Sequence, residues 1–574
     1  MKSPLLVLAL FLCSLVVPPA IAQGPPPVMG DSSGLDFKQA GLLAIQDGGR
    51  RKPIDTFARE ALTKITGRST YKAQNGRKWQ GTDFVFSALL ETYDWKNEAM
   101  VLVGSSDLKQ KLGIENNARR FSFQQLTTLP ELQRLAGEVH ALRRADKTLD
   151  DLQQEVSTVS ERLTLLTRVM DGSAFLILPA ATKVTDPWVV PPAYGDYYKA
   201  EQFEPVQTHL QAFAAAYVQG DSFGFARAAN QLRDSLRALS PQIYPTEREL
   251  RTEHFYNHFA GFYRAAWAYG IALVLLTIAH LRGAGGVLKW SGVIATILGL
   301  IFHGAAITLR SVIAGRPPVT NMYESIIWVS FAVTVFGMIF YARYRTTIYL
   351  LAALPVSLVS LLLVHQMPIA MPSSIDPLVP VLRDNFWLTI HVLTITLGYA
   401  AFALAMGFGH ILLWRYAWNP AKARADQPMH FWLYRVLQLG VLLLAAGTIL
   451  GGVWANYSWG RFWGWDPKET WALIALLSYI LVLHGKLGGW WGQFGLAVGS
   501  VVCFLSVLMA WYGVNFILGK GLHSYGFGIG GESYVYTFVA FDLLFVGFAV
   551  WRYRTSRQKV RAAERTEAEE PVAV

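Results

Sequence analysis

The stretch from Trp459 to Trp471 holds four tryptophans, one phenylalanine and two glycines within thirteen residues. Aromatic rings beside glycines form a flat surface that the backbone can approach closely, which suits a large planar apolar ligand. An interfacial aromatic belt is the alternative interpretation, but a belt spreads its tryptophans over the ends of many helices. We therefore expect this loop to bind a planar ligand.

A helix start follows the aromatic residues directly. Asp466, Pro467 and Glu469 occupy the N-cap, N1 and N3 positions of a capping box. Such an N-cap contributes on the order of 1 kcal/mol without any ligand. We therefore favour a structural role for Asp466 over a catalytic one.

The composition indicates what kind of fold must position this loop. The 574 residues include 51 Lys and Arg against 40 Asp and Glu, a net charge of +11, and 52% are hydrophobic against 16% charged. This balance excludes a disordered or fibrous protein and indicates several membrane spans. The basic residues lie largely at the ends of apolar runs, where they orient helices, so we expect no nucleic-acid partner.

Nine apolar runs predict a mainly α-helical, polytopic membrane protein. The runs cover residues 262–280, 287–309, 326–341, 348–364, 387–414, 436–453, 471–483, 494–514 and 534–551. Basic residues gather in alternate connectors, which the positive-inside rule places in the cytoplasm. The loop at 457–471 and the connector at 517–533 then lie on the outer face, and the C-terminus is cytoplasmic.

The sequence divides into four predicted segments. Residues 1–22 have the pattern of a signal peptide, with Lys2, an apolar run and an Ala-Ile-Ala cleavage site; an uncleaved anchor is the alternative. Residues 23–260 predict an exported, largely helical soluble domain on the periplasmic side, of unknown function, with strong helical periodicity over 131–170 and 202–239. Residues 261–555 form the membrane domain, and residues 556–574 form a cytoplasmic tail.

The aromatic loop also carries a family resemblance. The run from Trp459 to Glu469 resembles the tryptophan-rich WWD signature of the haem-handling proteins of cytochrome c maturation. The region from His303 to Trp551 resembles the CcsA (ResC) membrane subunit of the system II cytochrome c synthase. Residues 316–325 are similar to a second signature of that family.

The resemblance implies a function and its chemistry. Haem b, bound non-covalently, would be moved or presented on the outer face of a bacterial cytoplasmic membrane. There the thiols of the C-x-x-C-H segment of apocytochrome c add across its vinyl groups. The chain would act within a holocytochrome c synthase complex, and its side chains would position and ligate haem without separate catalytic residues. Cys13 and Cys503 form no C-x-x-C motif, so a thioredoxin-like reductant must be a partner.

Three histidines fall on the positions of the family's iron ligands. His391 and His523 flank the aromatic loop in sequence and share its face of the membrane, and they match the axial ligands of the outer haem. His484, toward the inner end of the next helix, matches the intramembrane ligand, whose partner in the family comes from a CcsB (ResB) subunit. His303 is an in-chain candidate for that second ligand, although the topology places it nearer the outer half of its helix, and His410 is a weaker alternative.

The remaining expected haem contacts belong to the loop and to its surroundings. Haem propionates require cationic or forked donors, and outer-face arginines fit this need, although each also suits an interfacial anchor. The predicted contact residues are Trp459, Gly460, Arg461, Trp463, Gly464, Trp465, Asp466, Arg316 and Arg383. The exported domain is expected to dock a partner or the apocytochrome.

Two other functions are also compatible with the sequence. A system I haem chaperone or lyase component, similar to CcmC or CcmF, shares the WWD signature. A non-enzymatic membrane subunit with electron-transfer b haems, or a transporter, is a rival from another class. Electron-transfer haems usually take both ligands from within helices, whereas His523 lies in a connector, which favours haem handling.

Overall fold

The computed structural model describes residues 32–283, 285–368, 370–378, 382–519, 523 and 532–569, with side chains as far as residue 558. The predicted signal peptide at 1–22 lies outside these residues. The described chain forms two compact units, of which unit 1 runs to Phe259 and also takes in Ser374–Pro377, while unit 2 holds the remainder from Ala260 onward.

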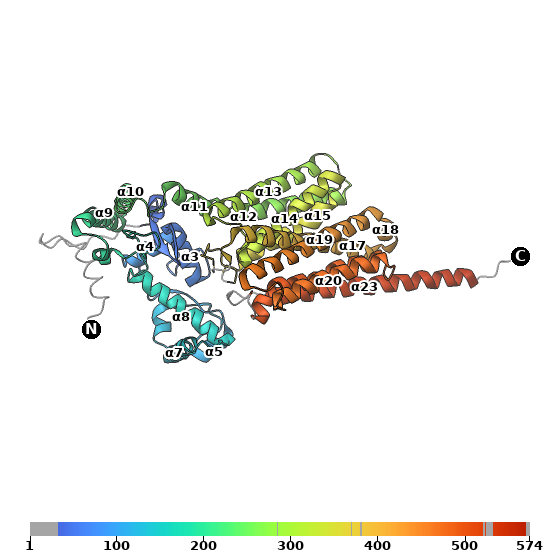
Figure 1. Ribbon diagram of the computed structural model, residues 1–574, viewed down its shortest axis with the longest axis horizontal. Coiled ribbons are helices and arrows are strands. Elements are labelled where there is room, and N and C mark those ends of the chain that lie inside the picture. Colours follow the sequence, from blue (N-terminus) through green and yellow to red (C-terminus); the bar gives the residue numbers. More distant parts are fainter. Residues whose placement is uncertain are drawn as a thin grey trace. The chain divides into compact units, whose positions relative to one another are not determined.

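Unit 1 combines three two-stranded antiparallel sheets with helices (Figure 1). The sheets pair β1 (Ala44–Asp47) with β2 (Arg50–Pro53), β3 (Thr70–Lys72) with β4 (Lys78–Gln80), and β5 (Ala99–Leu102) with β6 (Arg120–Ser122). The helical elements are η1 (Ser32–Gly34), α2 (Lys38–Gly41), α3 (Ile54–Thr66), α4 (Gly81–Leu89), α5 (Ser106–Leu112), α6 (Phe123–Thr127), α7 (Pro130–Arg144), α8 (Asp151–Met170), η2 (Pro191–Asp196), α9 (Ala200–Gln219), α10 (Ser222–Leu239) and α11 (Glu247–Phe259).

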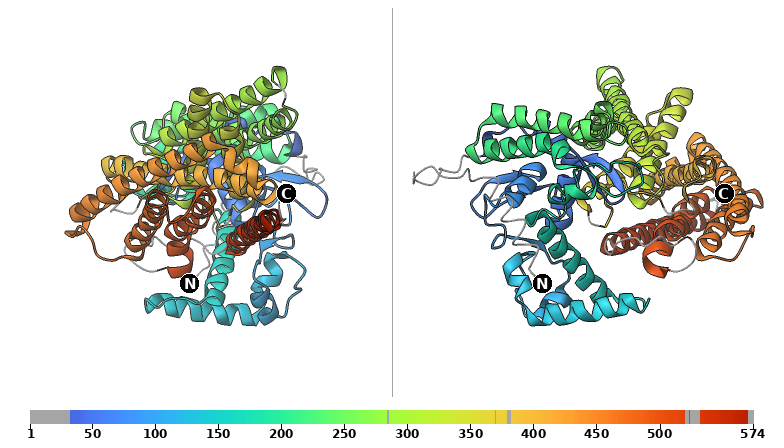
Figure 2. Two further views of the ribbon diagram at one scale, coloured as in Figure 1. Left: turned by 90° about the vertical axis from the view of Figure 1, so that its right-hand side faces the viewer. Right: turned by 60° about the vertical axis from the view of Figure 1, so that its left-hand side comes forward.

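The helical periodicity predicted for this unit corresponds to two helix pairs. Helices α7 and α8, cyan to teal in Figure 2, pack together over 130–170, and α9 packs on α10. The Asp150 side chain starts α8 through a capping box with Gln153. Because the apolar residues recur every three or four positions, each helix buries one face in the core of unit 1.

Unit 2 is a bundle of long helices (Figure 1). Its elements are α12 (Gly261–Leu281), α13 (Val287–Ala314), α14 (Met322–Tyr344), α15 (Ile348–Gln366), α16 (Asn385–Trp387), η4 (Leu388–Val392), α17 (Leu393–Trp418), α18 (Pro420–Ala425), α19 (Gln427–Trp459), α20 (Pro467–Leu487), α21 (Gln493–Val502), α22 (Phe504–Leu508), η5 (Met509–Leu518) and α23 (Glu532–Glu569). The elements η4 and η5 are π-helical turns.

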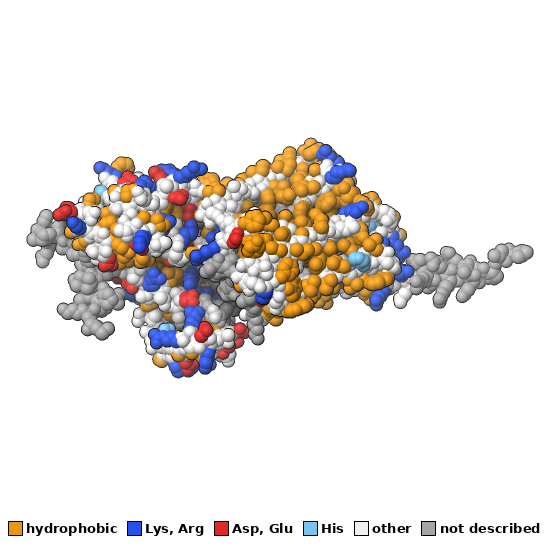
Figure 3. Space-filling model, viewed as in Figure 1, with side chains coloured by type: hydrophobic (Ala, Val, Ile, Leu, Met, Phe, Trp, Pro, Cys, Tyr) orange, Lys and Arg blue, Asp and Glu red, His pale blue; other side chains and the backbone are white. Residues whose placement is uncertain are grey.

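The predicted membrane fold is confirmed. In the described part of the chain, nine helices are long and apolar enough to cross a bilayer, so the protein is a multi-pass membrane protein. The face of unit 2 seen in Figure 3 is covered mainly by hydrophobic side chains, and exposed residues such as Ile271, Leu442 and Leu544 match a lipid environment. Lys and Arg side chains gather at one end of this bundle.

Glycines let α19 pack closely against α17 and η4. A Cβ atom on Gly447 would lie 2.7 Å from Ile395 Cα, and one on Gly451 would lie 2.6 Å from His391 Cε1. Small residues at such crossings let two membrane helices approach backbone to backbone. The approach fixes the position of His391, which lies in η4 directly before α17.

Candidate functional site

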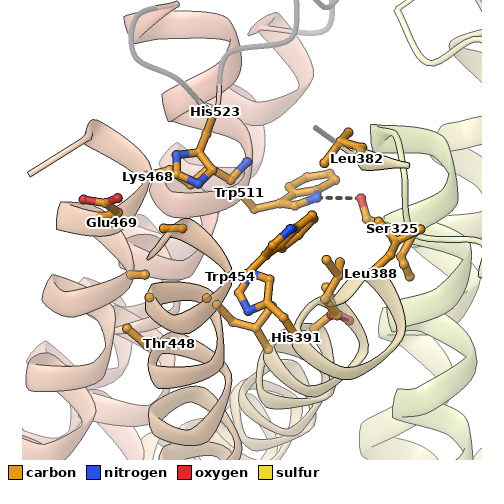
Figure 4. Close-up of a pocket in the computed structure, with 18 of the residues that line it drawn as sticks. Ser325, Leu382, Leu388, His391, Thr448, Trp454, Lys468, Glu469, Trp511 and His523 are labelled. Carbon is orange, nitrogen blue, oxygen red and sulfur yellow. Dashed lines mark hydrogen bonds between the residues drawn. The ribbon is translucent and has the colours of Figure 1, made fainter. Parts of the chain in front are cut away.

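One cavity in unit 2 is lined by His391, by His523 and by several tryptophans (Figure 4). It holds about 1260 Å³ of space, including space open to solvent. Its walls come from the starts of α14 and α20, from η4 and η5, and from the end of α19. His391 and His523 lie on opposite sides of it, and the indoles of Trp454 and Trp511 lie along one wall.

His391 is held by its own π-helical turn and by the neighbouring helix. Its Nδ1 hydrogen-bonds with the carbonyl oxygen of Gly447 at 2.8 Å, so Nδ1 carries the proton and Nε2 carries the lone pair. The Trp454 ring lies against the imidazole, with centroids 5.7 Å apart. Nε2 has no hydrogen-bond partner among the described residues, and it remains available to a ligand in the cavity.

His523 is oriented in an equivalent way from the other side. Its Nδ1 lies 3.0 Å from Oδ1 of Asp466, and because a carboxylate can only accept, Nδ1 donates and Nε2 keeps its lone pair. The Trp459 ring meets the imidazole edge-on at 5.0 Å. Burial lowers the pKa of His523 despite the opposing effect of Asp466, which favours the neutral imidazole that metals bind.

Asp466 joins the aromatic loop to this histidine. The predicted capping box is present, with the Asp466 side chain accepting from the Lys468 backbone N–H at 3.0 Å and Glu469 reaching back to the Asp466 N–H at 3.1 Å. Glu469 also accepts from the Gly464 N–H at 2.8 Å, which folds the loop onto the helix start. Asp466 therefore has the expected structural role and, in addition, orients His523.

The loop tryptophans divide into two groups. Trp459 and Trp463 line the cavity together with Phe462. Trp465 is 70% exposed and does not line it, and its φ of 58° is rare for so bulky a residue. Gly460 has φ 69° and ends α19 in the left-handed conformation that glycine adopts at low cost.

Residues of both predicted signatures line the cavity. Ser325 on α14 accepts a hydrogen bond of 2.8 Å from Trp511 Nε1 on η5. Asn321 caps α14 by accepting from the Glu324 N–H, and the Glu324 carboxylate pairs with Arg310 at 2.8 Å, with both side chains fully buried. This buried pair fixes the segment that forms one wall.

The predicted arginines lie beside the cavity but do not line it. Arg461 pairs with Glu469 at 3.0 Å. Arg316 lies 3.4 Å from the Thr320 hydroxyl, and Arg383 is exposed and donates to the Leu378 carbonyl oxygen. Among the described residues, the cation that does line the cavity is Lys468, whose Nζ lies 3.5 Å from Asn515 Oδ1.

Sequence reasoning missed Lys468, Asn515, Trp454 and Trp511. Lys468 was visible as a cation inside the aromatic signature, where an ionisable residue at the start of an apolar span is functional by default. Trp511 lies within a long apolar run and Trp454 directly follows one, and their spacing gives no sign that they face the cavity. They add aromatic surface to the cavity.

The other candidate histidines lie elsewhere in unit 2. His303 is buried with both ring nitrogens engaged, by the Tyr269 hydroxyl at 3.3 Å and by the Ile327 carbonyl oxygen at 2.9 Å. His410 pairs with Asp542 at 2.7 Å. His484 is exposed, and its Nδ1 hydrogen-bonds within its own helix.

The cavity suits a planar macrocycle with a metal at its centre. Two imidazoles line it from opposite sides, each with Nδ1 already hydrogen-bonded, and indole rings supply apolar contact surface between them. Haem held by two histidines needs this donor set, and Lys468 supplies one positive charge for an acidic substituent.

The part of the chain that holds the cavity is similar to known proteins. Residues 319–523 match the family described as Cytochrome C assembly protein. The chain is 33% identical over 264 residues to the cytochrome c biogenesis protein CcsA of Prochlorococcus marinus subsp. pastoris, a match that covers 41% of this chain and 83% of that protein. It is 34% identical over 258 residues to CcsA of Guillardia theta, covering 40% and 84%.

A further relative matches a longer part of the chain. Protein NrfI of Wolinella succinogenes is 28% identical over 514 residues, which covers 86% of this chain and 54% of NrfI. This chain therefore spans about half the length of NrfI. The part of the chain after residue 260 is too short for a match of that length, so the match includes residues of unit 1 as well.

Proposed function

Because the chain belongs to the CcsA family of cytochrome c assembly proteins, we propose that it holds haem b in the outer cavity, between His391 and His523, and presents it for covalent attachment to apocytochrome c. One observation carries this proposal. Both imidazoles use Nδ1 to bond a fixed acceptor, the Gly447 carbonyl or the Asp466 carboxylate, so both leave Nε2 for the haem iron.

The chain's contribution to the reaction is to bind and orient. His391 and His523 ligate the iron, Trp459 and Trp463 contact the porphyrin, and Lys468 pairs with a propionate. Haem itself supplies the vinyl groups, to which the two reduced thiols of the apocytochrome add. Holding haem in one orientation makes the encounter with the thiols effectively intramolecular, which lowers the barrier to their addition.

His484 is the proposed ligand of a second, intramembrane haem on the path to the outer cavity. Its side chain is exposed on the bundle, so the opposing ligand has to come from outside the described residues. A CcsB-like membrane subunit is the proposed donor. His303 is a poor alternative because hydrogen bonds already engage both of its ring nitrogens.

The proposed membrane is the bacterial cytoplasmic membrane, with unit 1 on the periplasmic side. Basic residues follow α14 at Arg345, occupy α18 at Lys422 and Arg424, and follow the apolar part of α20 at Lys486. These positions match cytoplasmic connectors by the positive-inside rule. The outer cavity then faces the compartment in which apocytochromes are matured, and a thioredoxin-like protein there keeps their thiols reduced.

The direct test is haem content. The protein is purified in detergent, and reduced-minus-oxidised and pyridine haemochrome spectra are recorded for the wild type, His391→Ala and His523→Ala, each with and without imidazole. His365→Ala is the matched control, because this exposed histidine on α15 does not line the cavity. We expect both cavity variants to lose b-type haem, imidazole to restore it, and the control to keep it.

Two outcomes would reject the proposal or change its class. If His391→Ala and His523→Ala keep haem at the wild-type level, the cavity is not the haem site. If the wild type carries haem but supports no cytochrome c production in a reconstituted host, an electron-transfer subunit or a transporter becomes the better interpretation.

A further inference from the structure

Unit 1 contains a second cluster of metal-ligating side chains, far in sequence from the haem cavity. Helix α11 carries His254 and His258 one turn apart, and their rings stack with centroids 4.2 Å apart. Asp55, in the first turn of α3, faces them. One ligand atom from each of these three residues lies within 4.8 Å of the other two.

The lone pairs of both imidazoles are positioned for a metal. His258 Nδ1 bonds the His254 backbone carbonyl oxygen at 2.9 Å, so its Nε2 carries the lone pair, 3.8 Å from Asp55 Oδ1. The ring nitrogens of His254 have no hydrogen-bond partner in the described part of the chain. Two histidines four residues apart on one helix face are a recurrent pair of metal ligands.

The carboxylate is buried and already compensated by a partly exposed cation. The Asp55 side chain is 7% exposed, and Arg59, which is 33% exposed, lies 3.2 Å from its Oδ2. The same guanidinium lies 3.0 Å from His258 Nε2, so one cation contacts both the Asp55 carboxylate and the His258 imidazole. A divalent cation can displace it, because Arg59 is long and can extend into solvent. Asn257 donates to Asp55 at 2.9 Å and orients the carboxylate.

The cluster opens into a cavity of unit 1. Asp55, His254 and His258 line about 1530 Å³ of space, which includes space open to solvent, together with charged residues such as Asp36 and Arg77. Gly41 lies beside the cluster and adds no side chain to it. A Cβ at this position would lie 3.7 Å from His254 Nε2. Three protein ligands beside an open space leave a coordination position for water or for a donor from a second molecule.

We propose that Asp55, His254 and His258 bind a divalent transition-metal cation of the zinc class, with one coordination position open to the cavity. Imidazole and carboxylate donors together suit such borderline cations better than they suit Mg²⁺ or Ca²⁺. The site is separate from haem ligation, and its residues belong to unit 1 alone.

The test measures Zn²⁺ bound by the full-length protein in detergent, by equilibrium dialysis with elemental analysis. The variants are His254→Gln combined with His258→Gln, then Asp55→Asn, and Arg59→Gln. His140→Gln is the control, because this exposed histidine on α7 lies outside the cluster. Haem content is recorded for every variant, so that a failure of this site is distinguished from a failure of the outer haem site.

The expected result is that the double-histidine and Asp55 variants weaken Zn²⁺ binding by more than the roughly 10- to 100-fold that loss of an outer-shell partner costs. His140→Gln binds as the wild type does. Arg59→Gln binds more tightly, because the competing cation is gone, and misfolding cannot produce this gain. If the wild type binds no more Zn²⁺ than the double variant, or if Arg59→Gln binds more weakly than the wild type, the proposal is wrong.

Discussion

Replacing Asp466 by asparagine separates its two roles. The Asp466 carboxylate caps α20 through the Lys468 N–H and accepts from His523 Nδ1, each at 3.0 Å. Asparagine is as good an N-cap as aspartate, so the helix start is retained. What changes is the charge that His523 faces.

The size of the effect follows from the two hydrogen bonds. A hydrogen bond to a charged group contributes about 1.5–3 kcal/mol and a neutral one about 0.5–1.5 kcal/mol, so Asp466→Asn loses about 1–1.5 kcal/mol at His523. Since about 1.4 kcal/mol is a factor of ten, we expect roughly tenfold weaker haem retention. A less basic imidazole also favours ferrous haem, and the reduction potential rises by up to about 60 mV. Asp466→Ala loses the cap too, at about 1 kcal/mol more.

The assay is a redox titration of the purified protein, followed by haem transfer to an excess of an apo-haem-binding protein. Asp221→Asn is the control, because Asp221 caps α10 in unit 1 and contacts no histidine in the described residues. Thermal unfolding of all variants is measured in the same detergent. If Asp466→Asn keeps the wild-type potential and haem retention, Asp466 acts only as a cap, and its orienting role is refuted.

Three further predictions concern the surroundings of the cavity. Gly451→Ala places a Cβ 2.6 Å from His391 Cε1, so we expect it to displace this ring and lower haem content, measured by pyridine haemochrome. His484→Ala is expected to keep the spectrum of the outer haem but to stop cytochrome c production in a reconstituted host, measured by haem staining. Arg310→Met leaves the fully buried Glu324 carboxylate unpaired, so it should destabilise the protein by about 3–5 kcal/mol, measured by denaturation in detergent.

Each of these predictions has an outcome that contradicts it. Gly547→Ala is the control for the first, since a Cβ there meets nothing within 4 Å; equal haem content in both glycine variants would argue against His391 as a ligand. A His484→Ala protein that still matures cytochrome c has no need of the second site. Arg310→Met with wild-type stability would show that the ion pair contributes nothing to folding.

The nine spans were predictable because long apolar runs are a local property of the sequence. The ends of some helices differ from the ends of the apolar runs, because a second local signal also determines where a helix begins. The run at 471–483, for example, belongs to a helix that begins at Pro467, because the capping box starts α20 one turn before the apolar residues do. Lys468 is thereby placed on the helix and against the cavity.

The site was predictable in its parts but not in its connections. The capping box around Asp466 follows from four consecutive residues, whereas the hydrogen bond from His523 to Asp466 joins residues 57 positions apart. No local sequence pattern predicts such a contact. The same holds for Trp454 and Trp511, which reach the cavity from helices that the apolar pattern describes only as spans.

The two π-helical turns explain why the signature loop alone does not make the site. His391 lies in η4, while Trp511 and Asn515 lie in η5, and all three residues line the cavity. A π turn takes an extra residue and gives up the favoured hydrogen-bond spacing, so it persists where surrounding contacts compensate for it. Here the Gly447 carbonyl holds His391, and the Ser325 hydroxyl holds Trp511. The two π-helical segments therefore place the His391 imidazole and the Trp511 indole against the same cavity.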